Sequence, residues 1–471
     1  MALPAWRSFQ RALYDPAAAQ ERVLRRILDG ARHSAFVREH DLRDPADLRR
    51  VPVRTWEELS PWVDRVIQGE PRVLCDAPIT RFEPTSGTSS ARKLVPSTAP
   101  GRRELSRAVQ AWMVDTFARD PRLLGGPSYW SISPTLPAGR TPGGVPIGFD
   151  TDAGTLGGLA ERVVARTLVS VPRGLQGEDF WRATAIALLR ARELRLISIW
   201  NPSFGLLLHD AVRRHWDEAL RTLPARVASR IDPDRPWPAL RLISTWGDAA
   251  AAAELPALKE RFPGIPLQEK GLLATEGIVS VPFAGQRPLA LTSHLLELLR
   301  DDGSVIPAWR AEPGEEGVVV LTTGHGLWRY RLGDRVRVTG RLHATPTVRF
   351  LGREGAVVDT RGEKLGEAFV TEVLARLGVR GFALLAPEDG GYVLYAVEPP
   401  DADALESALR DNPHYAWCVS LGQLRSARVE RAHPDAAQRY VARLAAEGRR
   451  HGDVKPAHLS GRGGWRATLV G

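Results

Sequence analysis

Short strand-like segments alternate with helix-like segments from about Ile79 onward, and this alternation restricts the fold more than any other feature of the chain. The strand-like segment 195–200, for example, is followed by a helical pattern that runs to Leu220. Strands and helices that alternate in this way form βα units with largely parallel sheets. The sequence therefore predicts an α/β protein.

The strand expected over 239–246 ends at Gly247-Asp248, and an alanine-rich helix follows at once. In open parallel sheets, ligands bind at the carboxyl ends of the strands. We therefore expect this turn to form one wall of a binding site.

The pattern changes twice along the chain, which indicates more than one structural unit. After about residue 290, strands follow one another without long helices, and Gly352 to Gly355 then interrupts the pattern before helices and strands resume. A chain of 471 residues is also too long for one average domain. The predicted organisation is a large N-terminal domain with mostly parallel sheets at 1–351, which includes a helical segment at 1–70 and a small β-rich subdomain at about 290–351, then a hinge at 352–355 and a smaller, mobile α+β C-terminal domain at 356–471.

Composition bears on location and partners. No apolar stretch approaches the roughly 20 residues that span a bilayer, and the first residues lack the continuous apolar core of a secretory signal. We therefore expect a soluble, cytoplasmic protein with no membrane partner. The two cysteines, Cys75 and Cys418, give neither a disulfide framework nor the spacing of a zinc site. The net charge is +9, but the arginines are scattered among acidic residues, which argues against a nucleic-acid partner.

Lysine is rare in this chain, so its positions carry information. Only five of the 64 basic residues are lysines. A compact ammonium is preferred where one phosphate or carboxylate oxygen must meet a point charge. Lys93, Lys364 and Lys455 lie near Gly or Pro in non-helical contexts, whereas Lys259 lies in an expected surface helix. The first three are therefore the lysines that we expect to meet a ligand oxygen.

A loop rich in Gly, Ser and Thr lies between two strand-like segments and ends in a lysine. Its residues are Thr85, Ser86, Gly87, Thr88, Ser89, Ser90, Ala91, Arg92 and Lys93. Backbone N–H groups and hydroxyls of such a loop can meet phosphate oxygens, while the lysine supplies charge. It is not a Walker loop, because G-x-x-x-x-G-K-[ST] is absent, and its S-x-x-K lacks the S-D-N and K-T-G of serine acyl-enzymes. A plain surface turn is the alternative.

Four further segments follow in order. They are Leu272 to Gly277 (LLATEG), Thr322 to Asp334 (TTGHGLWRYRLGD), Phe350 to Glu354 (FLGRE) with Gly362 to Leu365 (GEKL), and Gly452 to Pro456 (GDVKP). Together with the loop, they resemble the auxin-responsive acyl acid amido synthetase family within the acyl-adenylate-forming enzymes. That family is known best from plants, and the chain resembles a bacterial-type member. The match spans roughly Ile79 to Lys455.

The resemblance implies an N-terminal adenylation domain that binds ATP and Mg²⁺. It implies that Glu276 binds Mg²⁺, that Asp334 accepts the ribose hydroxyls, and that Lys455, Lys93 and Arg353 are the catalytic cations. Lys455 would bridge the acyl carboxylate and the α-phosphate, where negative charge develops during activation. The ATP-binding residues implied in this way are Thr85, Ser86, Gly87, Thr88, Ser89, Ser90, Lys93, Thr245, Gly247, Asp248, Thr275, Glu276, Asp334, Arg353 and Lys455.

Each of these residues also has a plainer interpretation. Glu276 alone would be a solvated loop residue, and Asp334 would cap a turn or pair with Arg335. Lys455 would be an exposed residue of a tail, and Arg353 would form a surface ion pair. Lys364 could approach the nucleotide or the acceptor, and His325 could satisfy a turn.

The substrate pocket is less defined. Plant members have a tyrosine that can stack on adenine where this chain has Leu272, so Trp246 is an alternative platform. We expect the acyl pocket between the helix at 104–117 and the strand at 128–134. Its candidate walls, which could equally be plain core, are Trp112, Trp130 and Trp200.

The sequence thus predicts a two-step ligase. A carboxylic acid and ATP give an acyl-adenylate and pyrophosphate, and an amine, in the main hypothesis an amino acid, then attacks to give an amide and AMP. One alternative keeps the first step and transfers the acyl group to coenzyme A or a carrier thiol. Another is a non-catalytic binding protein on the same fold. The acid, the amine and the oligomeric state stay open.

Overall fold

The computed structural model describes residues 2–85, 93–131, 139–148, 168–169, 171, 175, 177–354, 357–446 and 457–471. These residues group into two compact units. The larger unit ends at Gly352, and the smaller one is built mainly from Arg353 to Gly471. Lys93 and the first residues of helix α7 (Gly177–Arg190) also group with the smaller unit.

The larger unit starts with a series of capped helices. Asp15 caps α2, where its Oδ1 accepts from the Ala18 N–H at 3.1 Å, and Thr55 and Glu58 form a capping box at the start of α4. Such caps supply acceptors for N–H groups that a helix cannot pair internally. The bounds are α1 Ala2–Tyr14, α2 Pro16–Asp29, α3 Ala35–Glu39, the 3-10 helix η1 Pro45–Arg50 and α4 Trp56–Ile67.

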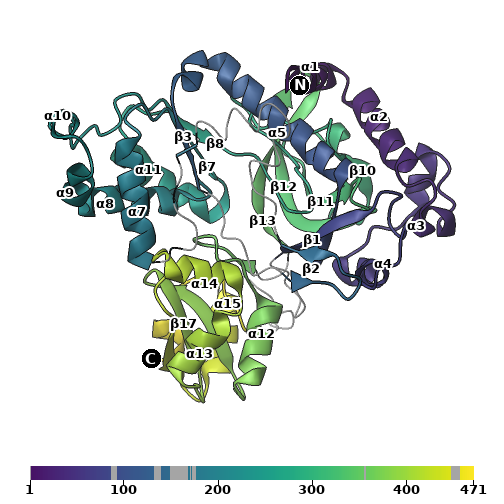
Figure 1. Ribbon diagram of the computed structural model, residues 1–471. Coiled ribbons are helices and arrows are strands. Elements are labelled where there is room, and N and C mark those ends of the chain that lie inside the picture. The colour runs from purple at the N-terminus through teal and green to yellow at the C-terminus, as the bar shows by residue number, and fades with distance from the viewer. Residues whose placement is uncertain are drawn as a thin grey trace. The chain divides into compact units, whose positions relative to one another are not determined.

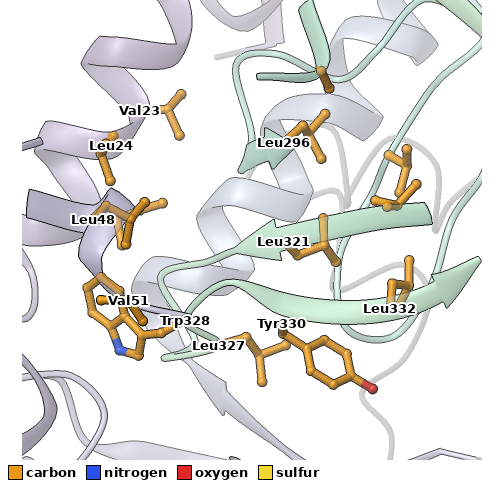
Figure 2. Packing of buried hydrophobic residues seen from close by; sticks show 14 of the residues in the cluster. Val23, Leu24, Leu48, Val51, Leu296, Leu321, Leu327, Trp328, Tyr330 and Leu332 are labelled. Atoms are coloured by element: carbon orange, nitrogen blue, oxygen red, sulfur yellow. The ribbon is translucent and has the colours of Figure 1, made fainter. Parts of the chain in front are cut away.

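A five-stranded antiparallel sheet carries the main core of the larger unit, in the order β10-β9-β11-β12-β13. Figure 2 shows Val23 and Leu24 of α2 in one buried cluster with Leu296 and Leu321 of this sheet. Burial of this apolar surface holds the helices on the sheet. The predicted β-rich subdomain is confirmed, and its elements are β9 Leu295–Leu299, β10 Val305–Pro307, the 3-10 helix η5 Ala308–Arg310, β11 Glu316–Thr322, β12 Tyr330–Leu342 and β13 Thr345–Arg353.

A four-stranded sheet in the same unit has the order β3-β6-β7-β8, and every neighbouring pair in it is parallel. Figure 1 shows α8 and α11 beside this sheet. Its strands are β3 Ser128–Trp130, β6 Leu196–Ser198, β7 Leu242–Thr245 and β8 Leu267–Glu269. The helical elements along the same stretch are α7, α8 Pro202–Arg214, α9 Trp216–Arg221, α10 Ala225–Ala228, η4 Ala249–Glu254 and α11 Leu255–Arg261. The α/β prediction is therefore confirmed.

A third sheet of the larger unit follows the order β2-β1-β5-β4 and leads into a long helix. Thr98 caps that helix, α5, because its Oγ1 accepts from the Gly101 N–H at 3.1 Å. The bounds are β1 Ile79–Thr85, β2 Lys93–Thr98, α5 Ala99–Arg119, the 3-10 helix η2 Pro121–Gly125, β4 Gly139–Arg140 and β5 Pro146–Ile147.

The smaller unit is an α+β structure. β16 and β17 are antiparallel, and β17 and β18 are parallel. One apolar cluster of this unit contains Leu394, Tyr415 and Cys418, and a second contains Tyr395 and Trp465. The elements are β14 Val357–Val358, β15 Leu365–Gly366, α12 Glu367–Arg376, β16 Ala383–Glu388, β17 Gly391–Ala396, α13 Ala402–Leu409, α14 Pro413–Ser420, β18 Arg428–Arg431, α15 Ala436–Ala446 and α16 Arg466–Leu469.

Two further findings bear on the expectations from composition. Cys75 and Cys418 are both free and buried. Within the described ranges, no helix has the length and apolar character needed to cross a bilayer.

His325 is built into the core of the larger unit. Its Nδ1 accepts from the Thr98 N–H at 3.0 Å, so the imidazole completes the start of α5. A Cβ at Gly101 would lie 2.3 Å from this Nδ1, so only glycine allows the close approach. Burial lowers the pKa of His325 to about 4, although Glu104 raises it and His294 and Arg102 lower it further. The ring is therefore neutral in the folded chain at neutral pH.

We expect this histidine to weaken the fold in mild acid. Between pH 6.5, the ordinary pKa of the group, and about 4, the unfolded chain binds a proton that the folded chain does not. The free energy of unfolding therefore falls as the pH drops through this window, by on the order of 3 kcal/mol for this group. Urea unfolding of the wild type and of His325→Gln between pH 4.5 and 7.5 measures the effect, and the variant should show the flatter slope. His33→Gln, at an exposed histidine, is the control; parallel curves for wild type and His325→Gln would contradict the assignment.

Candidate functional site

The carboxyl edge of the parallel sheet brings several predicted residues together. Thr245 ends β7 and is buried, and its Oγ1 has no hydrogen-bond partner among the described residues. The Lys270 N–H, which follows β8, donates to the Thr245 carbonyl at 2.8 Å, and the Trp246 N–H donates to the Trp200 carbonyl at 3.1 Å. The residues that follow β6, β7 and β8 are therefore neighbours, as the parallel arrangement predicts.

Gly247 allows a close approach at this edge. A Cβ there would lie 2.6 Å from Cγ of Glu269, a contact that real side chains do not make. The neighbouring Trp246 is half-buried, and its ring meets that of Phe350 at a centroid distance of 5.6 Å. The backbone after β7 is thus held tightly against β8.

Asp248 ties this turn to the strand β13. Its Oδ2 accepts from the Phe350 N–H at 2.9 Å. Its Oδ1 lies 2.8 Å from Arg287 Nη1 and 3.2 Å from Arg349 Nε, but accepts no hydrogen bond of normal geometry from the described residues. Two guanidinium charges favour the ionised carboxylate, and Oδ1 keeps the capacity to accept a hydrogen bond from a ligand.

Glu276 lies in a tight turn of the larger unit. The Ala274 and Gly277 backbones exchange hydrogen bonds at 3.0 and 3.2 Å, so Thr275 and Glu276 form the turn between them. The Glu276 side chain is 4% exposed, and its Oε1 has no hydrogen-bond partner in the part of the chain that the structure describes. A buried carboxylate oxygen without a donor is rare in folded proteins. The interpretation of Glu276 as a solvated loop residue is wrong, since the side chain is buried.

Asp334 occupies an irregular position of β12. The register between β11 and β12 shifts between Val318 and Val320, opposite Gly333 and Asp334, and Gly333 has a φ of 86°. Such a bulge re-aims the side chain beside it. Asp334 is buried, and Arg335 forms an ion pair with Asp301.

The predicted phosphate-binding loop lies mostly outside the described residues. Thr85 ends β1, although its side chain is not described, and Ser86, Gly87, Thr88, Ser89 and Ser90 lie outside, as does Lys455. Lys93 is buried at the first position of β2. Arg353 ends β13, with its side chain outside the described part. Lys364 is exposed in the smaller unit at a φ of 46°.

The three candidate pocket tryptophans differ in their surroundings. Trp112 is buried, and its Nε1 donates to Gln268 Oε1 at 2.9 Å, which links α5 to β8. The Nε1 of Trp130 donates to Ser128 Oγ at 3.1 Å. Trp200 is 46% exposed, and Lys270 Nζ lies 5.1 Å from the centre of its ring. Trp200 is therefore the one of the three with an open face.

Lys270 is a site candidate that the sequence analysis missed. It is buried and follows β8 directly at the carboxyl edge of the parallel sheet. Its rarity as a lysine and its place after a predicted strand were signals available in the sequence. They were not combined, because β8 has only the three residues Leu267–Glu269 and is weak as a strand pattern.

Comparison with known proteins places the chain in a family. The sequence model "GH3 family N-terminal domain" matches residues 5–234, and "GH3 family central domain" matches residues 291–353. Together the two cover more than half of the chain. The chain belongs to the GH3 family. The acyl-adenylate resemblance read from the five segments is thereby confirmed.

Members of the GH3 family with assigned names are similar over most of this chain. The "Probable indole-3-acetic acid-amido synthetase GH3.7" of Oryza sativa subsp. japonica is 25% identical over 82% of this chain and 78% of its own length. The human "GH3 domain-containing protein" is 30% identical over 58% of this chain and 51% of its own length. The solved structure "AtGH3.15 acyl acid amido synthetase in complex with 2,4-DB" has a TM-score of 0.66 at 18% identity and covers 100% of this chain and 97% of that one. The GH3 fold is thus shared over the whole chain.

Proposed function

We propose that this chain is an acyl acid amido synthetase, a ligase that forms a carbon–nitrogen bond through an acyl-adenylate. In the first step, a carboxylate oxygen of the acid attacks the α-phosphorus of ATP, the bond to the bridging oxygen breaks, and pyrophosphate leaves. In the second step, the nitrogen of an amine attacks the acyl carbon, the bond to the phosphate oxygen of AMP breaks, and the nitrogen loses a proton. Membership of the GH3 family and the names of its relatives support this reaction.

The buried Glu276 carboxylate is the structural observation that carries the proposal. Mg²⁺ in nucleotide enzymes takes one or two protein carboxylates together with phosphate oxygens and water. Glu276 offers an oxygen without a donor, so it fits this role. When bound, Mg²⁺ would offset the negative charge of the phosphates.

The carboxyl edge of the parallel sheet is proposed to hold the adenosine part of ATP. The Thr245 hydroxyl and Asp248 Oδ1 have unused hydrogen-bonding capacity there, and Gly247 keeps the backbone close to the site. Trp246 would supply the stacking surface in place of the family tyrosine at Leu272. Asp334 would accept the ribose hydroxyls.

The remaining catalytic roles rest on the family resemblance. The loop Thr85 to Ser90 would hold the phosphates with Lys93. Arg353 and Lys455 would complete the cations around the α-phosphate, after a rotation of the C-terminal domain about the hinge at 352–355 that also brings Lys364 toward the site. Positioning and exclusion of water, with no covalent enzyme intermediate, would supply the rate enhancement.

The acid would lie beside Trp200 and Trp130. Trp112 is engaged with Gln268, so it contributes apolar surface only from within the core. The exposed Trp200 ring favours an acid with a flat apolar body. An amino acid is the proposed acceptor, and the location in the cytoplasm stays a prediction.

The proposal is tested by ATP–pyrophosphate exchange in the presence of a panel of aromatic and aliphatic carboxylic acids. Exchange that depends on an acid is expected, followed by AMP release and an amide when amino acids are added. Thioester formation with coenzyme A or a carrier thiol, and none with amino acids, would favour the thiol acceptor. Folded protein that binds ATP yet shows no exchange with any acid would favour a non-catalytic binding protein.

A further inference from the structure

A cavity of about 170 Å³ lies in the larger unit, away from the edge of the parallel sheet. Its lining comes from α2, from the first half of α5 and from the turn after β11. The charged residues that line it are Arg26, Arg103, Glu104 and Arg107. None of these residues is among those that the sequence assigns to ATP.

One face of α5 turns toward the cavity. Pro100, Arg103, Glu104 and Arg107 all line it, and their spacing of three and four residues places them on one side of a helix. Arg26 reaches the cavity from α2. The two helices thus present three guanidinium groups and one carboxylate to one enclosed space.

Glu104 does not balance these charges, because its hydrogen bonds go elsewhere. Its Oε2 accepts from His294 Nδ1 at 3.0 Å and from the Gly324 N–H at 2.8 Å. Its Oε1 lies 4.0 Å from Arg26 Nε. Among the described residues, no carboxylate lies within ion-pair distance of Arg103 or Arg107. The cavity therefore carries a net positive charge.

Two of the guanidinium groups also have buried donors without acceptors. Arg26 Nε and Arg107 Nη1 have no hydrogen-bond partner within the described part of the chain. Burial lowers the pKa of Arg26, and the charge of Arg107 lowers it further. Unmet buried donors of this kind are rare and call for a bound group. An anion would satisfy the donors and remove the repulsion at once.

The frame around the cavity is rigid. A Cβ at Gly324 would lie 2.6 Å from Glu104 Oε1, so the turn after β11 presses against α5. The indole of Trp328, which also lines the cavity, is fully buried, and its Nε1 donates to the Leu74 carbonyl at 3.0 Å. The arginines are thus held by packed neighbours, which lowers the entropy that binding must cost.

We propose that this cavity binds a small oxyanion of the phosphate class, with two or more negative charges, through Arg26, Arg103 and Arg107. Planar guanidinium forks match the oxygens of such an anion. A cavity of this size holds more than one water molecule, so a phosphate ion fits. Binding here is independent of the proposed ligase reaction.

Calorimetric titration of the full chain with inorganic phosphate, in chloride buffer without ATP, tests the proposal. We expect one saturable site per chain. Arg103→Gln and Arg107→Gln should each weaken binding by about tenfold or more, as for the loss of a charge-assisted hydrogen bond. Arg119→Gln removes a guanidinium from the end of the same helix, where it pairs with Asp115, and should leave binding unchanged.

Further arms separate the other outcomes. Lys93→Ala should leave phosphate binding intact, and loss of binding in that variant would assign the site to the nucleotide instead. Tighter binding of succinate than of phosphate would overturn the phosphate class. Arg103 is exposed, so Arg103→Gln keeps the test valid if Arg107→Gln does not fold. Equal affinity in wild type and Arg103→Gln, or no saturable binding, would refute the site.

Discussion

Replacing Glu276 with glutamine is expected to lower acid-dependent ATP–pyrophosphate exchange by about 10²- to 10³-fold, the size of effect seen when one transition-state contact is lost. Glutamine keeps the shape of the side chain but removes its charge, so it is a poor ligand for Mg²⁺. Because Oε1 has no protein donor to lose, the fold should be unchanged. Exchange is measured over a range of Mg²⁺ concentrations, and the variant should need more Mg²⁺ for half-maximal rate.

The control for this prediction is Glu260→Gln, which removes the charge of an exposed glutamate on α11. It should leave both the rate and the Mg²⁺ requirement as in the wild type. Circular dichroism and urea unfolding check that both variants fold. A rate for Glu276→Gln within threefold of the wild type would show that Glu276 does not serve the reaction.

Replacing Asp248 with alanine is expected to destabilise the larger unit by about 3 kcal/mol, since breaking a buried ion pair leaves a charge uncompensated. The Asp248 side chain is 3% exposed and that of Arg287 is 17% exposed. The substitution also leaves the Phe350 N–H without its acceptor. Urea unfolding followed by tryptophan fluorescence measures the loss, because most of the 14 tryptophans precede Gly352 and so report on the larger unit.

Glu316→Ala provides a matched control. Glu316 pairs with Arg337, but these side chains are 33% and 53% exposed, so the loss should stay below about 1 kcal/mol. Adding Arg287→Met to Asp248→Ala should recover part of the stability, because the uncompensated charge is then removed. Additive losses in the double variant would show that the cost does not come from Arg287.

Local patterns predicted much of the fold. Short apolar runs such as 195–200 and 239–246 correspond to β6 and β7, since a strand that is buried on both faces needs a continuous apolar run. The observed strands are shorter at their ends. Trp246, for example, leaves the sheet because its N–H bonds to the carbonyl of Trp200, which the sequence pattern does not show.

The candidate site was predicted in part. Thr245, Gly247 and Asp248 follow a parallel strand, and this position alone marks them as site residues. The partners of Asp248 were not predictable, because Arg287, Arg349 and Phe350 come from elements far along the chain. Lys270 was missed for a related reason, since its burial depends on how neighbouring strands pack.

The sequence by itself determined the α/β architecture, the β-rich subdomain and the family, because periodicity and ordered motifs are local properties of the chain. Tertiary structure alone decided which polar groups are left unmet. Glu276 is buried without a donor, and Arg26 of α2 meets Arg107 of α5 around a common cavity. Hydrogen-bond satisfaction depends on the packing of segments that are distant in sequence, and no local pattern encodes it.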